Sequence, residues 1–264
     1  MNLEALIVRA ERGPMRKLPP GIALWSNAQL HRVLGEPELR ELPRLVREGT
    51  IAVDIGAHFG TYSLALARLV GRQGTVVSVE PIAEDAAMLR RAAAQLRLPI
   101  DVVQAALSDR SGTATMHIPK LHGYEKTALS SLESTVQASE VTAIEEREVP
   151  VRTLDEVMSV YAKPVSFLKI DVEGHELPVL AGAEGTIRTH RPAILIEIND
   201  DLGGERTAQD VFAWIAGRGY HGEFLEDGRY RRPISAFDVA RHQTAVAGDV
   251  LSDRYVNNFI FLPD

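Results

Sequence analysis

The segment IAVDIGAHFG, residues 51–60, decides the fold prediction. Its first half, Ile51–Ile55, is a short apolar run, and the glycines at positions 56 and 60 form a turn before a helical pattern. A second apolar run, Thr75–Val79, follows that helical pattern. A buried strand, a glycine-rich turn, a helix and a second buried strand are together typical of a β-α-β unit with parallel strands.

The same alternation of apolar strands and helices continues along the chain. Apolar runs without polar interruption indicate strands that are buried on both faces, as in a parallel sheet covered by helices. We therefore predict an α/β fold with a Rossmann-like, mostly parallel central sheet and helices on both faces. The further predicted elements are helices over Ala83–Leu98, Glu176–Thr189 and Thr207–Gly217, and strands over Ile100–Val103, Val165–Ile170, Ala193–Ile198 and Asn257–Leu262.

Two stretches fall outside this alternation. Residues 1–49 are predicted to form a helical lead-in, broken by prolines, that contacts substrate or a second copy of the chain. Residues 50–264 form the main domain, with a polar segment at about 119–148 predicted as an insertion or mobile lid. A hairpin-like extension over Leu107–Ile118 precedes that segment, and a short helix over Val151–Val160 follows it.

Composition excludes several classes of protein. The 264 residues are 45% apolar and 25% charged, as in an ordinary soluble enzyme, and no apolar run approaches the roughly 18 residues of a membrane span. Met1–Arg12 lacks the features of a secretory signal, so we expect a cytoplasmic protein. The absence of cysteine excludes disulfides, a thiolate zinc site and a cysteine nucleophile, and the net charge of −7 argues against a nucleic-acid partner.

The turn after the first predicted strand carries the first chemical signal. It lacks the G-x-G-x-x-G spacing of dinucleotide enzymes, and the carboxylate of Asp54 would repel a pyrophosphate but favour a cationic ligand. S-adenosylmethionine is such a ligand, because it has a sulfonium and an ammonium and no phosphate. Glu80 ends the second strand, where an acidic side chain accepts hydrogen bonds from a ribose diol. Together these residues predict a nucleoside pocket.

A second signal follows the strand predicted over Val165–Ile170. The sequence KIDVEGHE, residues 169–176, places several ionisable groups directly after buried strand residues, which is costly unless they have a task. Since Asp171 follows a central strand of a parallel sheet, we expect it to point into the same crevice as Asp54.

These segments resemble the FkbM family of S-adenosylmethionine-dependent methyltransferases. The resemblance covers roughly residues 50–200 and the end of the chain, and it implies a class I methyltransferase fold. It also implies methyl transfer to hydroxyl oxygens, often on sugars or polyketide-type natural products. The matching segments are LKIDVEGHE (168–176), VDIGAHFGTY (53–62), Glu80-Pro81, ALSD (106–109) and NFIFLP (258–263).

The resemblance also implies which residues bind the cofactor. The turn after the third strand is expected near the adenine. One departure is His58, because the family more usually has asparagine at this position. The implied cofactor-binding residues are Asp54, Gly56, Ala57, His58, Gly60, Thr61, Tyr62, Glu80, Pro81, Ala105, Ala106, Ser108 and Asp171.

Methyl transfer to a hydroxyl requires removal of a proton, and two schemes fit the residues. In the first, His175 is the general base and is held by Asp171 or Glu173. In the second, Asp171, Glu197 and Asn199 bind Mg²⁺, which prefers hard oxygen ligands, as in catechol-type methyltransferases. The predicted catalytic residues are thus Asp171, Glu173 and His175.

The predicted function is adenosylmethionine-dependent O-methyl transfer to a hydroxyl of a small molecule, sugar or natural-product glycoside. Methyl transfer to nitrogen or carbon is an alternative, although no Asn-Pro-Pro-Tyr type motif follows the fourth predicted strand. A non-catalytic nucleoside-binding module of the same fold is another alternative, and a nicotinamide oxidoreductase is a third. Formation of a homo-oligomer is left open.

Overall fold

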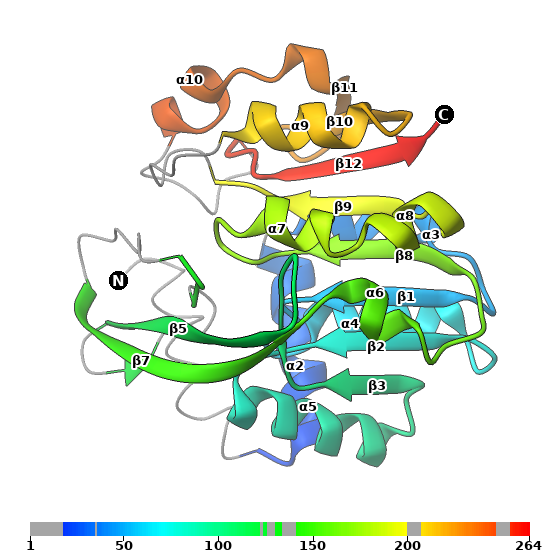
Figure 1. The fold of residues 1–264 in the computed structure, drawn as a ribbon, viewed down its shortest axis with the longest axis vertical. Helices are drawn as coiled ribbons and strands as arrows, with labels where there is room; N and C mark the ends of the chain where they lie inside the picture. Colours follow the sequence, from blue (N-terminus) through cyan, green and yellow to red (C-terminus); the bar gives the residue numbers. More distant parts are fainter. Residues whose placement is uncertain are drawn as a thin grey trace.

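An eight-stranded sheet forms the centre of the protein (Figure 1). The computed structural model describes residues 18–34, 36–121, 124–125, 130–133, 141–199, 207–246 and 254–264. In spatial order the strands are β3 (Ile100–Val103), β2 (Thr75–Val79), β1 (Ile51–Ile55), β8 (Val165–Ile170), β9 (Ala193–Glu197), β12 (Asn258–Pro263), β10 (Tyr220–Glu226) and β11 (Tyr230–Pro233).

Most neighbouring strands of this sheet are parallel. The pairs β2–β3, β1–β2, β1–β8 and β8–β9 are all parallel, whereas β12 runs antiparallel to both β9 and β10. The edge strand β11 pairs antiparallel with β10. The predicted α/β fold with a mostly parallel central sheet is confirmed.

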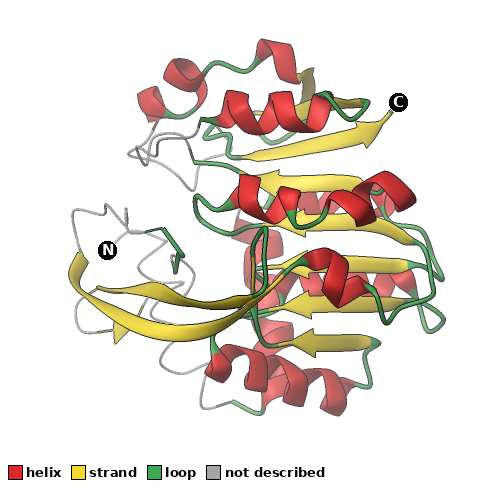
Figure 2. Ribbon diagram, viewed as in Figure 1, coloured by secondary structure: helices red, strands yellow, loops and turns green. Residues whose placement is uncertain are grey.

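Helices cover both faces of the sheet (Figure 2). One face packs against α2 (Pro20–Leu34), α3 (Leu42–Leu45), α4 (Thr61–Val70) and α5 (Ala83–Leu96), with the short 3-10 helix η2 (Pro37–Arg40) between α2 and α3. The other face packs against α6 (Leu154–Met158), α7 (Glu176–Ala181), α8 (Glu184–His190) and α9 (Ala208–Ala216).

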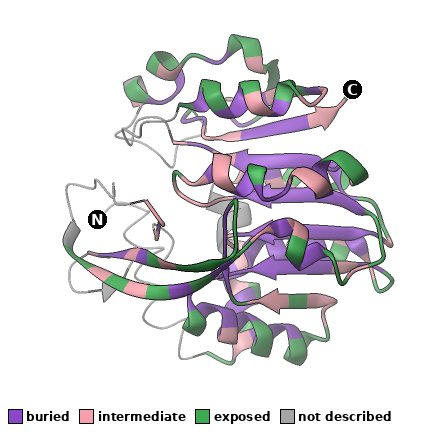
Figure 3. Cartoon of the chain, viewed as in Figure 1, coloured by how far each residue is buried: buried purple, intermediate pink, exposed green. Residues whose placement is uncertain are grey.

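Successive side chains of the central strands point to opposite faces of the sheet and belong to two hydrophobic layers. Every residue of β1 and β8 is buried (Figure 3). Val53 and Leu168 face the layer that includes α7 and α9, whereas Ala52 and Phe167 face the layer beneath α3 and α4. Burial on both faces explains why these strands read as continuous apolar runs. No helix of the described residues is long and apolar enough to cross a membrane.

An antiparallel arm includes both ends of the segment that is predicted as a polar insertion. Strands β5 (Gly112–Leu121) and β7 (Val141–Arg152) pair along their lengths and extend from the edge of the sheet where the parallel strands end (Figure 1). A short strand, β4 (Ala106–Leu107), pairs with the end of β7, and another, β6 (Tyr124–Glu125), pairs with β5.

Strands occupy both ends of residues 119–148, and the interpretation of this segment as an insertion or mobile lid stays a prediction. The helix predicted over Val151–Val160 is confined to α6, since Val151 and Arg152 still belong to β7. Exposed charged residues alternate with less exposed ones along β7, and this pattern was too polar to be identified as a strand.

Other boundaries also differ from the prediction. The helix predicted over Glu176–Thr189 is two helices, separated by Gly182 and Ala183. Several elements of the last third of the chain were not predicted: β10, β11, α10 (Val239–His242) and the 3-10 helices η5 (Ile234–Ala236) and η6 (Thr244–Val246). The division of the chain at residue 49 stays a prediction, and residues 1–17 of the lead-in lie outside the described residues.

Candidate active site

The turns that follow β1 and β8 meet at the carboxyl edge of the sheet. Gly56 has a φ of 77°, and a Cβ atom at this position would lie 1.9 Å from the carbonyl oxygen of Asp171. Gly60 has a φ of 82°, and a Cβ there would lie 2.5 Å from Leu89 Cδ1 of α5. Both glycines are therefore required by contacts within the protein as well as by backbone conformation.

Asp54 lies on the face of β1 that is covered by α4. Its Oδ2 accepts a hydrogen bond from Ser63 Oγ at 2.5 Å, and Ser63 Oγ lies 2.7 Å from Ser78 Oγ. Burial raises the pKa of Asp54 to about 6, although the hydrogen bond from Ser63 and the charge of Lys169 oppose the rise. Asp54 thus anchors α4 to the sheet, and its contact with a cationic ligand stays a prediction.

Glu80 connects the turn after β1 to the beginning of α5. Its carboxylate is buried and accepts hydrogen bonds from the backbone amides of His58 and Ile82, both at 2.8 Å. Burial and then the charge of Asp85 raise the pKa of Glu80 to about 8, while the two amide hydrogen bonds oppose the rise. The predicted contact with a ribose requires the remaining lone pairs of these oxygens.

The other residues predicted to bind the cofactor lie around these turns. Thr61 begins α4, and its Oγ1 accepts a hydrogen bond from Asn27 Nδ2 of α2 at 3.1 Å. Tyr62 presents its ring to Lys169, whose Nζ lies 5.1 Å from the ring centroid. The remaining residues are buried or half-buried: Ala57, Pro81, Ala105 and Ala106. Their roles in cofactor binding stay predictions.

His175 has partners that the sequence did not predict. Its Nδ1 lies 2.8 Å from Glu133 Oε1, and its Nε2 lies 2.9 Å from Ser108 Oγ. The predicted support by Asp171 or Glu173 is therefore wrong, because a carboxylate from the inserted segment occupies that position. This contact joins residues 42 positions apart, so no local pattern could have revealed it.

Residues 130–133, which include Glu133, contact the turn after β8 at a second point. Ser131 Oγ donates a hydrogen bond to the carbonyl oxygen of Glu173 at 2.6 Å and accepts one from the amide of Glu133 at 3.0 Å. The backbone of Ser131 also pairs with that of His117 in β5. Glu173 itself has a left-handed backbone, with a φ of 48°. The arm therefore supports the turn that carries Asp171, Glu173 and His175.

A buried lysine lies beside the predicted acidic residues. Lys169 Nζ is 3.4 Å from Asp171 Oδ2 and 3.7 Å from Glu197 Oε2. Burial opposes the charge of Lys169, but the carboxylates of Asp171, Glu197 and Glu36 outweigh it and raise the lysine pKa. Burial and the nearby charge of Asp171 also raise the pKa of Glu197. The sequence analysis included Lys169 in the charged motif but gave it no role.

The predicted metal ligands come together only in part. Carboxylate oxygens of Asp171, Glu173 and Glu197 lie within 4.8 Å of one another, a spacing that can place three oxygens around an ion. Asn199 does not direct its oxygen to this cluster: its Nδ2 lies 3.5 Å from Glu197 Oε1, and its Oδ1 accepts a hydrogen bond from Tyr255. The contacts of Lys169 further reduce the fit of a metal, because an ammonium already lies beside two of the carboxylates and offsets part of their charge.

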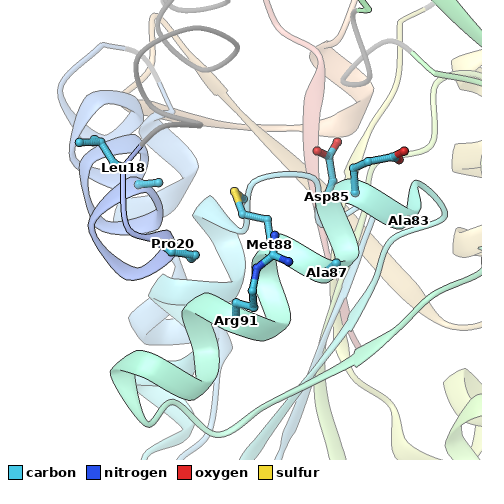
Figure 4. A pocket seen from close by; sticks show the side chains of 9 residues that line it. Leu18, Pro20, Ala83, Asp85, Ala87, Met88 and Arg91 are labelled. Carbon is cyan, nitrogen blue, oxygen red and sulfur yellow. The ribbon is translucent and has the colours of Figure 1, made fainter.

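A separate cavity of about 400 Å³ lies between the beginning of α2 and α5 (Figure 4). Its apolar lining includes Leu18, Ala23 and Met88, and Asp85 and Arg91 add charge. None of the predicted site residues lines this cavity. The carboxylates at the ends of β8 and β9 and this cavity are therefore distinct features of the structure.

The match to one solved structure, with a TM-score above 0.5, shows the class of fold. Methyltransferase FkbM from Methylobacillus flagellatus matches with a TM-score of 0.52 and 16% identity, covering 89% of this chain and 50% of that chain. The O-methyltransferase TomG from Streptomyces achromogenes, which is involved in tomaymycin synthesis, matches with a TM-score of 0.48 and 14% identity, covering 91% and 89%. The fold is that of the class I methyltransferases.

The sequence gives the family. The FkbM methyltransferase domain model matches residues 54–221, which is more than half of the chain. The chain therefore belongs to the FkbM family of S-adenosylmethionine-dependent methyltransferases. No curated protein matches the sequence significantly. The chain spans half the length of the Methylobacillus protein.

Proposed function

We propose that this chain transfers the methyl group of S-adenosylmethionine to a hydroxyl oxygen of a small molecule, sugar or natural-product glycoside. The observation that carries the proposal is the convergence of the β1 turn with the partly exposed carboxylates of Asp171 and Glu197, which follow or end neighbouring strands. Family membership supports methyl transfer, whereas the choice of oxygen rests on the resemblance of the sequence motifs.

The chain offers a place for each part of the cofactor. Glu80 lies where a ribose is expected, the turn from Gly56 to Gly60 lies beside it, and Ser108 ends the turn over Ala105–Ser108 that is predicted near the adenine. S-adenosylmethionine, when bound, supplies an electrophilic methyl group on sulfur. Transfer breaks the bond between sulfur and methyl, leaves that electron pair on sulfur, and forms a bond from methyl to the acceptor oxygen.

His175 is the proposed base. If its Nδ1–H donates a hydrogen bond to Glu133, the lone pair of the ring is on Nε2, where it accepts a hydrogen bond from Ser108 Oγ. Ser108 Oγ also lies 3.2 Å from Asp109 Oδ1. A rotation of the serine hydroxyl toward Asp109 would release Nε2 to take the acceptor proton, while Glu133 stabilises the resulting imidazolium.

The magnesium scheme is not part of the proposal, because Lys169 lies against two of its predicted ligands. Methylation of nitrogen or carbon also leaves S-adenosylhomocysteine and differs from the proposal only in the methylated product, whereas a binding module without catalysis leaves the cofactor unchanged. Turnover with a hydroxylated acceptor yields S-adenosylhomocysteine and a methyl ether. A binding module yields neither product.

The first test is calorimetric titration with S-adenosylhomocysteine and, separately, with NAD. Micromolar binding of S-adenosylhomocysteine that is lost in Glu80→Ala supports the proposed pocket, whereas tighter binding of NAD contradicts it. Hydroxylated sugars and polyketides are then screened for methyl transfer. With an acceptor in hand, His175→Ala is expected to lower kcat by about 10²-fold or more, and unchanged turnover would refute the role of His175 as base.

A further inference from the structure

Lys169 is a charged residue in the centre of the protein core. It is the fifth residue of the six-residue strand β8, where every position is buried, and its side chain is only 2% exposed. In the sheet it stands beside Asp54 of β1 and Leu195 of β9, so its side chain lies on the face covered by α4. Transfer of an ammonium from water into such a core is costly unless charges of opposite sign surround it.

The surroundings of Lys169 compensate its charge without hydrogen bonds. Among the described residues, no acceptor has hydrogen-bonding geometry toward Nζ. The ammonium instead has two carboxylate oxygens at 3.4 and 3.7 Å, from Asp171 and Glu197, and the face of the Tyr62 ring at 5.1 Å. Charge and ring electrons thus hold the ammonium in place.

The two carboxylates are more accessible than the lysine. The side chain of Asp171 is 33% exposed and that of Glu197 is 22% exposed, whereas Lys169 is closed off beneath them. A ligand that approaches the carboxyl edge of the sheet therefore meets the carboxylates first. Lys169 acts on such a ligand only through the position and charge of these two residues.

A divalent cation at the carboxylates does not fit while Lys169 is charged. Mg²⁺ binds carboxylate oxygens at about 2.0–2.1 Å. An ion at that distance from both Asp171 and Glu197 would lie within a few ångströms of an ammonium that the core prevents from moving away. Repulsion between this ion and the buried ammonium would oppose metal binding. The displacement of Asn199 from the cluster removes a further predicted ligand.

We propose that Lys169 takes the place of a divalent cation in this site: it is a positioning residue that holds the carboxylates of Asp171 and Glu197 together at the carboxyl edge of the sheet, and the site binds no metal. The positioning part rests on the proposed methyl transfer. The exclusion of metal does not, because it follows from the charges and distances alone.

Titration calorimetry with MgCl₂ and with MnCl₂ tests the exclusion of metal. The wild-type chain is expected to show no binding up to about 1 mM of either ion. Lys169→Met removes the charge and keeps an apolar chain of similar length, so the carboxylates of Asp171, Glu173 and Glu197 should bind Mn²⁺ with a dissociation constant at least tenfold below that limit of about 1 mM. Lys169→Arg keeps the charge and should bind no metal, like the wild type.

Two outcomes would overturn the proposal. Micromolar binding of Mg²⁺ or Mn²⁺ by the wild type would show that Lys169 does not exclude a metal, and this measurement needs no variant. Failure of a folded Lys169→Met to gain metal affinity would have the same meaning, with folding checked by circular dichroism. Binding of S-adenosylhomocysteine is measured on the same samples, so that failure of the proposed function is distinguished from failure of the inference.

The positioning role has its own readout. In assays with an identified acceptor, addition of EDTA should leave wild-type turnover unchanged. Lys169→Met should lower kcat at least tenfold while its affinity for S-adenosylhomocysteine stays within about twofold of wild type, because the carboxylates lose their fixed position and the cofactor turn does not. A loss of turnover with EDTA, or equal turnover in Lys169→Met, would contradict it.

Discussion

The two halves of the carboxyl edge differ in how their charged groups are held. At the ends of β1 and β2, Asp54 and Glu80 are buried and accept hydrogen bonds from a serine hydroxyl and from backbone amides. At the ends of β8 and β9, Asp171 and Glu197 stay partly exposed beside the charge of Lys169, and Glu197 also accepts a hydrogen bond from Asn257 Nδ2 at 2.7 Å. The first half is fixed by directional bonds, whereas the second combines the charge of Lys169 with hydrogen bonds from Asn199 and Asn257 to Glu197.

The largest expected effect comes from disrupting the contact between the turns after β1 and β8, which connects the two halves. Gly56→Ala would place a Cβ 1.9 Å from a backbone oxygen that cannot move without shifting the turn after β8. We expect a loss of more than about 3 kcal/mol in the free energy of unfolding, measured with urea. Gly49→Ala is the matched control: its φ of 78° is nearly the same, but no atom lies within 4 Å of the new Cβ.

In the control, the free energy of unfolding should fall only by the cost of placing alanine in a left-handed conformation, about 1–2 kcal/mol. Equal losses in the two alanine variants would mean that backbone conformation alone matters and that the close approach of Gly56 to Asp171 does not constrain the site.

A second change tests only the half at the ends of β1 and β2, which is fixed by hydrogen bonds. Glu80→Ala leaves the buried amides of His58 and Ile82 without their acceptor, at a cost of about 1–3 kcal/mol for each. Glu80→Gln keeps one carbonyl oxygen and should lose about half as much. Thermal unfolding of both variants measures the difference, and a Glu80→Ala protein as stable as the wild type would contradict the account of this half.

Local patterns explain how much could be predicted from the sequence. The parallel strands, the turn after β1 and the acid after β2 are readable because each depends on neighbouring residues, and the structure confirms the fold that they predict. The contacts of His175 with Glu133 and of Lys169 with Glu197 join distant segments. Their residue types are visible in the sequence, but only the three-dimensional packing brings them together.

The arm shows a different limit. The charged residues of β7 suggested a polar insertion, because the antiparallel partner that buries Val149 and Val151 is itself distant along the chain. Pairing with β5 supplies the hydrogen bonds and the apolar contacts that the local sequence lacks. Strand formation there depends on tertiary contacts more than on propensity.

A smaller effect concerns pH. Burial raises the pKa of Glu80 to about 8 and that of Glu176 to about 7, so the folded chain holds protons that the unfolded chain releases near pH 4.5. Stability from these groups is complete below the unfolded pKa and is lost as pH rises through the folded values. We expect the free energy of unfolding to fall by at least about 1 kcal/mol between pH 5 and 8.

Urea unfolding at several pH values measures this slope, and Glu80→Gln is the control because it cannot release a proton. The slope should be smaller in the variant. A free energy of unfolding that rises over the same interval would show that the buried carboxylates are better compensated than their contacts indicate.

The smallest expected effect concerns the residue at which the chain departs from its family. His58 has a φ of 44°, a left-handed conformation that asparagine and histidine both tolerate better than most side chains do. His58→Asn should therefore change the free energy of unfolding by less than about 0.5 kcal/mol, whereas β-branched His58→Val should cost about 1–2 kcal/mol. If the asparagine variant loses as much as the valine variant, the imidazole rather than the backbone explains the position. Its approach to Asp85, with Nε2 3.8 Å from Oδ2, would then be the contact that stabilises the turn.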